Sequence, residues 1–518
     1  MLSRITLALR NLNERQTLLL LLGLTFGLRL CVVLMARGVA NDSAGYGFMA
    51  RDFIRGQYSK GLSSALHPFY PFLISIFSPG PAHVELTGRL ISLIWGTVTL
   101  LPVYILVKRA VGQKEATFAA LFYCLHPHLI AYSGMLLSEA TYWGLLTLSV
   151  YLFWTGLREG SLLESMSSSL LLALAYLTRP EAVGYLLVFV VWAAIYGGVT
   201  KRWIKKIVLI TGLICLFFAA SFPYLLQIQR ETGQWLISKK ALETQVRYLA
   251  VDQTEHGTQG PSLEKRPVVG QKPFGWVRRL REVANNILRY IPFTTYHYLK
   301  AYSFIFWIFL FFGLIRKRQE GEDLRYEWFL ASMVFLHVFS LATFVPSISR
   351  FSLPLIPISL LWAGAGVLAL HRFLKRRSVS EPAKWITLFI ILMVLIQLPF
   401  ELRAVRKDRE EQRTAGQWLK QNAPLEAIIM SNSPQEAFYA GRDFVVLPPA
   451  MPFRKGGGPS YQEVMSFARE KGAQYLLVNQ ETPSYNRNFF ESIPTSELQA
   501  VYRWEDQKKF TIIYKLPY

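Results

Sequence analysis

Long apolar runs alternate with short polar segments over the first 400 residues. A transmembrane helix needs about twenty apolar residues, because every backbone polar group must be satisfied inside the segment in the hydrocarbon core. About eleven runs meet or approach this length, at residues 17–35, 90–107, 116–131, 139–156, 167–177, 182–196, 207–226, 301–315, 328–345, 353–370 and 385–400. The pattern predicts an all-α polytopic membrane domain over residues 1–400, in which the run 167–177 is short enough to be a partial span.

The first long loop, residues 39–88, has the pattern of helices that lie in the membrane interface. Four apolar residues recur there at helical spacing, namely Tyr46, Met49, Ala50 and Phe53. The apolar run 69–77 that follows is too brief to cross the membrane. We therefore expect two interfacial helices in this loop.

A second long loop covers residues 227–300 and ends with an amphipathic stretch at 274–298. One face of this stretch is apolar, and the positive charge comes from Arg278, Arg279, Arg281 and Arg289. A basic amphipathic helix against anionic lipid headgroups is the expected structure.

Residues 401–518 differ in character from the rest of the chain. Polar helical patterns at 412–421 and 461–471 alternate with short apolar runs at 427–430, 444–447, 475–478 and 511–514. This alternation predicts a small soluble α/β domain.

The composition agrees with a membrane protein, since 52% of the 518 residues are hydrophobic, 17% are charged, and the mean hydropathy is +0.27. The 56 Lys and Arg outnumber the 34 Asp and Glu, but they form short clusters between apolar runs, which argues against a nucleic-acid partner. Cys31, Cys124 and Cys215 lie inside apolar runs without CxxC or Cys–His spacing. We expect them to be buried, with neither disulfides nor structural zinc.

The basic clusters also predict an orientation. They precede the first predicted span and follow the second, fourth, sixth, eighth and tenth, and comprise Arg4, Arg10, Arg15, Lys108, Arg109, Lys114, Arg158, Lys201, Arg202, Lys205, Lys206, Arg316, Lys317, Arg318, Arg372, Lys375, Arg376 and Arg377. All of these loops share one side, which the positive-inside rule places in the cytoplasm. The N-terminus is then cytoplasmic, and both long loops and residues 401–518 are extracytoplasmic, in what we expect to be a bacterial inner membrane.

The first apolar run has an alternative interpretation as a cleaved signal peptide, because Gly38-Val39-Ala40 resembles a small-residue cleavage site. The run exceeds the roughly 7 to 15 residues of a signal-peptide apolar region, and Arg29 interrupts it. We therefore expect an attached membrane anchor with Arg29 in an internal ion pair.

Two carboxylates stand at the outer boundary of the predicted spans. Asp42 follows the first span, and Glu139 opens the fourth. Since the first span ends outside and the fourth begins outside, both carboxylates are expected at the same depth and could share a site. Structural roles remain open, because Asp42 could cap a helix beginning near Ser43, and Ser138 with Glu139 could form an N-cap and a favourable first-turn anion.

Three basic or titratable residues are expected at the same boundary, namely His67, Arg179 and Arg350. An arginine fork matches phosphate oxygens, so the phosphate of an outer-leaflet lipid is a plausible partner. Alternatively, Arg179 could pair with Glu181 or extend toward the interface, and Arg350 could anchor in the headgroups.

The order of these features resembles the integral-membrane glycosyltransferases of the GT-C type, in particular their protein O-mannosyltransferase and aminoarabinose transferase branch. The family has an acidic residue after the first span, a basic residue before a Pro-aromatic interfacial helix, a carboxylate opening the fourth span, an Arg-Pro step, and an Arg before a Pro-x-x-Pro span. The matching residues are Asp42, His67-Pro68-Phe69-Tyr70-Pro71, Glu139, Arg179-Pro180, and Arg350 with Pro354 and Pro357. His67 stands where Lys is common, which makes its charge depend on pH.

The resemblance implies a polyprenyl-phosphate sugar as donor and a lipid, glycan or protein as acceptor. Asp42 would be the general base, and displacement of the lipid phosphate would invert the anomeric configuration. Glu139 would help to form the site and could hold a divalent cation, while Arg350, His67 and Arg179 would bind the donor phosphate. The resemblance implies neither a nucleotide nor an organic cofactor.

Two other classes of function use a similar scaffold. A transporter or lipid-linked-sugar flippase usually has repeated halves and ionisable residues near the bilayer midplane. Here the ionisable residues gather at one boundary beside long external loops, which favours an enzyme. A non-catalytic envelope assembly protein, with the α/β domain as an interaction module, is the third possibility.

Overall fold

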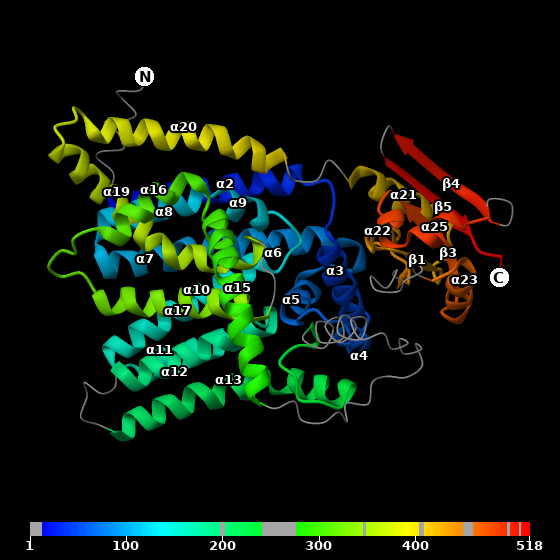
Figure 1. The fold of residues 1–518 in the computed structure, drawn as a ribbon, viewed down its shortest axis with the longest axis horizontal. Helices are drawn as coiled ribbons and strands as arrows, with labels where there is room; N and C mark the ends of the chain where they lie inside the picture. Colours follow the sequence, from blue (N-terminus) through cyan, green and yellow to red (C-terminus); the bar gives the residue numbers. More distant parts are fainter. Residues whose placement is uncertain are drawn as a thin grey trace.

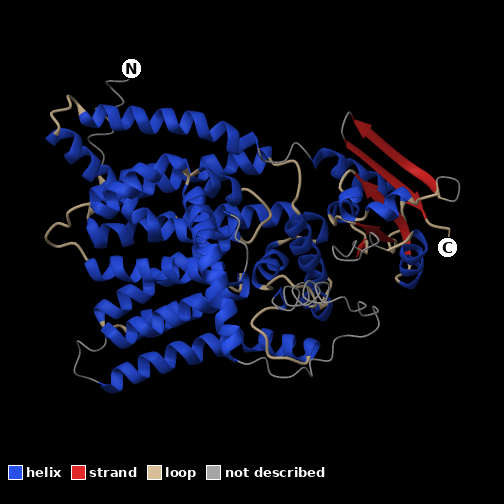
Figure 2. Cartoon of the chain, in the orientation of Figure 1, coloured by secondary structure: helices blue, strands red, loops and turns tan. Residues whose placement is uncertain are grey.

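The computed structural model describes residues 13–196, 203–240, 276–344, 349–403, 409–448, 459–494, 498–506 and 509–517. Strands are confined to the C-terminal part, and the described residues before it form helices joined by short connections (Figure 2). The helices form an elongated bundle with the C-terminal domain at one end (Figure 1). This architecture agrees with a helical membrane domain followed by a small α/β domain.

The bundle contains long helices and several short ones. Their bounds are α2 (Glu14–Met35), α3 (Asn41–Ile54), α4 (Tyr58–Leu62), α5 (Phe69–Phe77), α6 (Val84–Val98), α7 (Leu100–Val111), α8 (Gln113–Leu125), α9 (Pro127–Ser133), α10 (Glu139–Glu159), α11 (Leu162–Thr178), α12 (Ala182–Tyr196), α13 (Trp203–Thr232), α15 (Trp276–Tyr302), α16 (Phe304–Ile315), α17 (Leu324–Phe344), α18 (Ser349–Ser352), α19 (Ile356–Arg376) and α20 (Pro382–Arg403).

Four helical stretches of the described residues are long and apolar enough to cross a membrane, or five if one bent pair counts as a single span. They are Glu14–Met35, Pro81–Val111, Trp203–Thr232 and Ser349–Arg376, and the bent pair is Ile287–Tyr302 with Phe306–Ile315. Several other predicted spans are shorter apolar helices, such as α11 and α12. The chain is an integral membrane protein, but the expected count of about eleven spans is not confirmed.

Two predicted spans are broken by local backbone chemistry. The run 116–131 divides into α8 and α9, because Pro127 disfavours helical backbone at His126, which is extended with φ −69° and ψ 115°. The run 301–315 divides at Ser303, whose φ of 65° ends α15, and the two helices then meet at an angle of 113°. Composition alone predicts the apolar runs but not these breaks.

The first long loop is helical, as predicted. Its four regularly spaced apolar residues all lie on the buried face of α3, which packs against α5. The predicted amphipathic helix of the second loop is α15, but residues 241–275 and the side chains of 276–286, which include three of its four arginines, lie outside the described residues. The basic face of this helix therefore stays a prediction.

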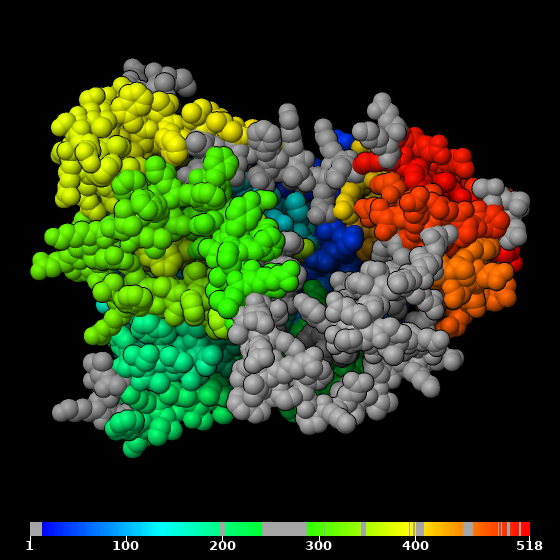
Figure 3. Space-filling view, in the orientation of Figure 1, coloured from blue at the N-terminus to red at the C-terminus, as the bar shows by residue number. Residues whose placement is uncertain are grey.

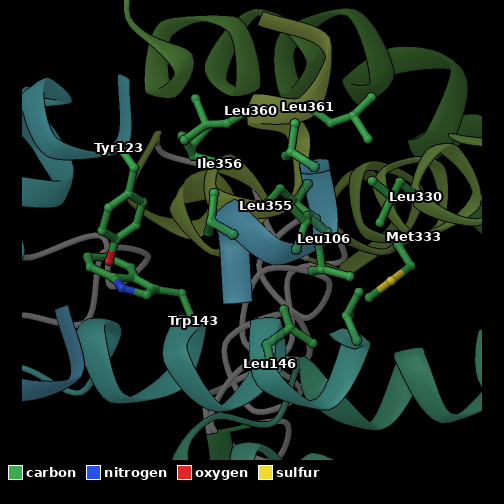
Figure 4. Close-up of a cluster of buried hydrophobic side chains, with 14 of the residues drawn as sticks. Leu106, Tyr123, Trp143, Leu146, Leu330, Met333, Leu355, Ile356, Leu360 and Leu361 are labelled. Atoms are coloured by element: carbon green, nitrogen blue, oxygen red, sulfur yellow. The ribbon is translucent and has the colours of Figure 1, made fainter. Parts of the chain in front are cut away.

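A large apolar core holds the bundle together. Side chains from α7, α8, α10, α17, α19 and the 3-10 turn Leu353–Leu355 before α19 pack together there, including Leu106, Tyr123, Trp143, Leu146, Leu330, Met333, Leu355, Ile356, Leu360 and Leu361 (Figure 4). Cys124 joins this core, whereas Cys31 and Cys215 are exposed on the bundle surface rather than buried as expected, and all three cysteines are free.

The buried Arg29 does not form the expected ion pair with any carboxylate among the described residues. Its guanidinium donates to the Ser133 hydroxyl at 3.2 Å and to the carbonyl oxygens of Thr25 and Tyr123, and it lies 4.9 Å from the centre of the Tyr123 ring. Hydrogen bonds and a cation–π contact replace the ion pair because neutral acceptors surround the guanidinium.

The C-terminal domain contains a five-stranded sheet in the order β2-β1-β3-β5-β4. Strand β1 is parallel to β2 and β3, and β5 is antiparallel to β3 and β4. The element bounds are α21 (Glu410–Asn422), β1 (Ile428–Ser431), α22 (Gln435–Ala440), β2 (Asp443–Val446), α23 (Tyr461–Glu470), β3 (Ala473–Asn479), α24 (Thr482–Tyr485), α25 (Arg487–Glu491), β4 (Gln499–Asp506) and β5 (Lys509–Lys515). The four predicted strands and two predicted helices are present, while α22, α24, α25 and β4 were not predicted.

A buried carboxyl makes the stability of this domain depend on pH. Glu436 accepts hydrogen bonds from the Ser433 hydroxyl at 2.8 Å and the Asn479 side-chain amide at 3.3 Å. Burial outweighs these bonds and raises the pKa of Glu436 to about 7. Between its ordinary pKa and this value, the folded chain holds a proton that the unfolded chain has released. The free energy of unfolding should therefore fall as pH rises through that window, by about 1.4 kcal/mol per pH unit.

We expect the E436Q variant to lose this dependence and to be more stable than wild type at pH above the window. Thermal unfolding of the detergent-solubilised full chain on both sides of the window measures the difference. E426Q changes an exposed glutamate of the same domain and serves as the matched control. If the stability of wild type and E436Q depended on pH in the same way, Glu436 would not be the group that holds the extra proton in the folded chain.

Candidate active site

Four of the predicted site residues come from separate elements that meet at one end of the bundle. Asp42 lies in the first turn of α3, Glu139 is the first residue of α10, Arg179 follows the last residue of α11, and Arg350 lies in α18. Arg179 has extended backbone, with φ −154° and ψ 136°, because Pro180 follows it and disfavours helix. The Arg-Pro step thus ends α11 where its side chain can reach the start of α10.

These side chains form one continuous ionic network. The Nη1 atom of Arg350 lies 2.8 Å from Oδ2 of Asp42, and its Nε atom donates to Oε1 of Glu139. Arg179 donates from Nη1 to the same glutamate oxygen at 3.0 Å, and from Nη2 to Glu181 at 3.0 Å. The structure therefore brings Asp42 and Glu139 together, with Arg350 bridging them.

The exposure of the side chains in the network decreases from the surface inward. The Asp42 side chain is 37% exposed and that of Arg350 is 20% exposed, whereas Glu139 is fully buried. A buried carboxylate needs charged or hydrogen-bonding partners, which the two guanidinium groups supply. Asp42 is thus the carboxylate that an entering molecule can reach.

The alternative capping hydrogen bonds are not formed, although Asp42 and Glu139 both lie in the first turn of their helices, where an anion is favourable. Helix α3 has Ala40 at its N-cap and no side-chain cap, and Ser138 makes no capping hydrogen bond at α10. The Ser138 hydroxyl instead bonds the Tyr46 hydroxyl of α3 at 2.7 Å. This bond ties α3 to the start of α10, beside Glu139.

Several buried polar atoms of the network have no hydrogen-bond partner among the described residues. They are Nη2 of Arg350, Nε of Arg179, and one carboxylate oxygen each of Glu139 and Glu181. Leaving such atoms unpaired costs about 1–3 kcal/mol each, and more when they are charged. The guanidinium donors suit phosphate oxygens, and the carboxylate oxygens suit hydroxyl groups.

The electrostatics of the site keep Asp42 ionised. Burial disfavours the charged carboxylate, but the positive charges of Arg350, Lys240 and Arg179 outweigh it and lower the pKa of Asp42. Lys240 was not among the predicted residues, because it lies inside the second long loop rather than at a span boundary. Its only sequence signal is the pair Lys239-Lys240 in that loop.

The segment before Lys240 is anchored to the bundle at three points. The Tyr176 hydroxyl donates to the Ile237 carbonyl at 2.6 Å, and the Lys239 ammonium donates to the Leu62 carbonyl at 2.6 Å. His67 provides the third contact, since its Nε2 atom lies 3.2 Å from the Ser238 hydroxyl. These contacts hold the second loop against the site.

His67 itself stands outside the ionic network. Its Nδ1 atom bonds the Tyr176 carbonyl at 2.7 Å, so both ring nitrogens are engaged with neutral groups. Burial lowers the pKa of His67 to about 3 and leaves the ring uncharged. The expected role as a cation for the donor phosphate does not fit this position, whereas anchoring the segment 237–240 does.

The suggested divalent cation at Glu139 does not fit the residues present. Arg350 lies between Asp42 and Glu139, and both guanidinium groups bind the same glutamate oxygen. Among the described residues there is no group of three or more His, Cys, Asp or Glu side chains that could hold a metal ion. We therefore assign the positive charge at Glu139 to arginine and derive no step through a metal.

Removing the charge of Glu139 is expected to destabilise the protein, because two buried arginines would lose their shared partner. The E139Q variant should lose about 3–5 kcal/mol of stability, measured by thermal unfolding and gel filtration in detergent. E159Q, at the other end of α10, replaces a glutamate whose side chain is 55% exposed and is the matched control. Equal stability of E139Q and E159Q would contradict a central role for Glu139 in the network.

Comparisons with known proteins agree with the resemblance inferred from the sequence. A family model described as dolichyl-phosphate-mannose-protein mannosyltransferase matches residues 66–226, which include Glu139 and Arg179 but neither Asp42 nor Arg350. No curated protein matches the sequence.

Solved structures with the same fold cover nearly the whole chain. ArnT from Cupriavidus metallidurans, bound to undecaprenyl phosphate, matches with a TM-score of 0.57 at 12% identity, over 96% of this chain and 97% of that chain. The Archaeoglobus fulgidus oligosaccharyltransferase, in complex with Zn and sulfate, matches with a TM-score of 0.60 at 14% identity, over 96% of this chain and 72% of that chain. The resemblance to GT-C glycosyltransferases is confirmed, and at these identities the structures show a shared fold.

Proposed function

We propose that this protein is a membrane glycosyltransferase that moves a sugar from a polyprenyl-phosphate donor to an acceptor hydroxyl on the extracytoplasmic face, with inversion. The observation that carries the proposal is the bridge that Arg350 makes between Asp42 and Glu139. Beside the accessible Asp42 carboxylate lie guanidinium donors that have no hydrogen-bond partner among the described residues. The proposed base and the proposed phosphate-binding groups thus lie side by side at one end of the bundle.

The reaction follows from these groups. Asp42 accepts the proton of the acceptor hydroxyl while the hydroxyl oxygen attacks the anomeric carbon of the donor sugar. The bond between that carbon and the phosphate oxygen breaks, and its electron pair leaves with the polyprenyl phosphate, which gains one negative charge. Arg350 and Arg179 stabilise this charge through the nitrogens that have no partner among the described residues, and Lys240 adds to the field.

The type of donor is supported by the structural neighbours. The ArnT structure of the same fold is bound to undecaprenyl phosphate, and the oligosaccharyltransferase structure holds sulfate, another oxyanion. A lipid tail can stay in the bilayer while its phosphate reaches the arginines. Residues 1–400 would then form the transferase domain, and residues 401–518 an extracytoplasmic domain beside it.

The proposed orientation is supported by where the basic residues gather. Lys108 pairs with Glu14, Arg109 with Glu159 at 3.2 Å, and Arg158 with Asp323 at 3.4 Å, so these helix ends lie together. They form the end of the bundle opposite α3 and the C-terminal domain (Figure 1). The positive-inside rule assigns that end to the cytoplasm and the ionic network to the other face.

A lipid-linked-sugar flippase is the alternative, and a micelle assay separates the two. A detergent micelle has no two leaflets between which a flippase could move a lipid, whereas a transferase needs no leaflets. Purified protein is therefore mixed with a lipid extract from a strain in which its own gene is deleted (the deletion strain). We expect a new glycosylated product, detected by mass spectrometry. Absence of product in micelles, together with lipid translocation in proteoliposomes, would favour the flippase and refute the transferase.

A further inference from the structure

Helix α22 of the C-terminal domain meets the N-terminus of α3, the helix that carries Asp42. The side chain of Gln435 contacts the Asn41 side chain. In the amide orientation that satisfies both of its ends, its nitrogen donates to Asn41 Oδ1 at 3.1 Å, and its oxygen accepts from the Asn41 backbone N–H at 3.2 Å and the Arg409 guanidinium at 2.6 Å. Since α3 has no side-chain cap of its own, Gln435 supplies one from a distant part of the sequence. The capped residue immediately precedes Asp42.

Phe438, one turn further along α22, completes the apolar core around α3. Its side chain is 1% exposed and belongs to the cluster that contains Ala44, Tyr46 and Ala50. The ring occupies the space above Gly47, where a β-carbon would lie only 2.2 Å from it. A residue of the C-terminal domain is therefore packed as part of the membrane domain.

Polar and aromatic contacts reinforce this position. The Arg51 guanidinium lies 4.3 Å from the centre of the Phe438 ring and donates to the Phe438 carbonyl at 2.8 Å. The Phe48 ring packs edge-on against Phe438 at 6.0 Å, and Lys60 pairs with Asp443 at 3.1 Å. At this end of the molecule the orange-to-red C-terminal domain lies directly beside a dark-blue patch of the N-terminal part of the chain (Figure 3).

We propose that the C-terminal domain positions the catalytic carboxylate, with Gln435 and Phe438 acting on Asp42 through α3. This inference rests on the proposed function. Helix α3 connects α22 to the site, because on its other side Tyr46 bonds Ser138 beside Glu139, and Asp42 pairs with Arg350. Loss of the α22 contact would let the start of α3 move, and a misplacement of about 1 Å can cost about 100-fold in rate.

The test compares F438A with the conservative variant F438L and with F490A. Phe490 is a ring of the same domain that packs on Phe510 at 5.6 Å, away from α3, and provides the matched control. We expect F438A to lower kcat by about 10- to 100-fold with little change in the KM for the lipid extract, F438L to restore most of the rate, and F490A to match wild type.

Hydrogen–deuterium exchange of residues 41–54 gives a second measurement that needs no activity. Exchange in α3 should accelerate in F438A and in Q435A, which removes only the cap, but not in F490A. Wild-type kcat in F438A, or unchanged exchange in α3 of both variants, would overturn the inference. An inactive wild-type protein would instead overturn the proposed function, while the exchange experiment would still test the linkage between α22 and α3.

Discussion

Replacing Asp42 with asparagine is expected to lower the rate of sugar transfer by about 100- to 10,000-fold, because the amide cannot accept the proton of the acceptor hydroxyl. The substitution preserves the size of the side chain, so the fold and the binding of donor should persist. Initial rates of purified protein with the deletion-strain lipid extract measure the effect. Because positive neighbours lower the pKa of Asp42, the wild-type rate should not fall through protonation of this group until the pH drops below the usual range of aspartate.

The matched control for this substitution is D506N, which changes an exposed aspartate at the end of β4. D506N should transfer sugar at the wild-type rate. A D42N protein that is folded and as active as D506N would show that another group, or none, removes the proton.

Replacing Arg350 with lysine is expected to lower the rate by about 100- to 1,000-fold and to raise the KM for the donor. Lysine keeps the charge, but its single ammonium cannot hold Asp42, Glu139 and a phosphate oxygen in the fixed geometry of a guanidinium fork. Initial rates over a range of donor-extract concentrations separate the two effects.

R377K is the control for the arginine prediction, since Arg377 is exposed just beyond the end of α19. Near-wild-type rate and KM in R350K would mean that a point charge is sufficient at this position. The bridge between the two carboxylates would then have no catalytic importance.

The sequence predicted which residues form the site, because carboxylates at a membrane boundary are rare and usually have a function. Asp42 and Glu139 lie at the ends of apolar runs, where acidic residues are scarce, and Arg179 and Arg350 are expected at the same boundary. The structure brings all four into one network. The bridging role of Arg350 was not predictable, because sequence spacing does not tell which guanidinium faces which carboxylate. For the same reason, the sequence did not predict that His67 would contact Ser238 rather than the ionic network.

The fold was predictable where patterns are long and regular. The apolar runs and the main strands of the C-terminal domain follow from periodicity. The break at His126 is marked only by the single residue Pro127, and the break at Ser303 depends on one backbone conformation. Helix α22 is only six residues long, and its apolar residue Phe438 packs on α3 of the membrane domain. A local pattern cannot predict a helix whose apolar side chain is buried by a distant segment.

A cryo-EM structure of the full chain with undecaprenyl phosphate would test the account most directly. We predict that the phosphate lies within hydrogen-bonding distance of Arg350 and Arg179, with Asp42 exposed beside it and Glu139 buried behind the two arginines. A phosphate bound elsewhere, or the two carboxylates separated with no common cavity, would contradict the proposed active site.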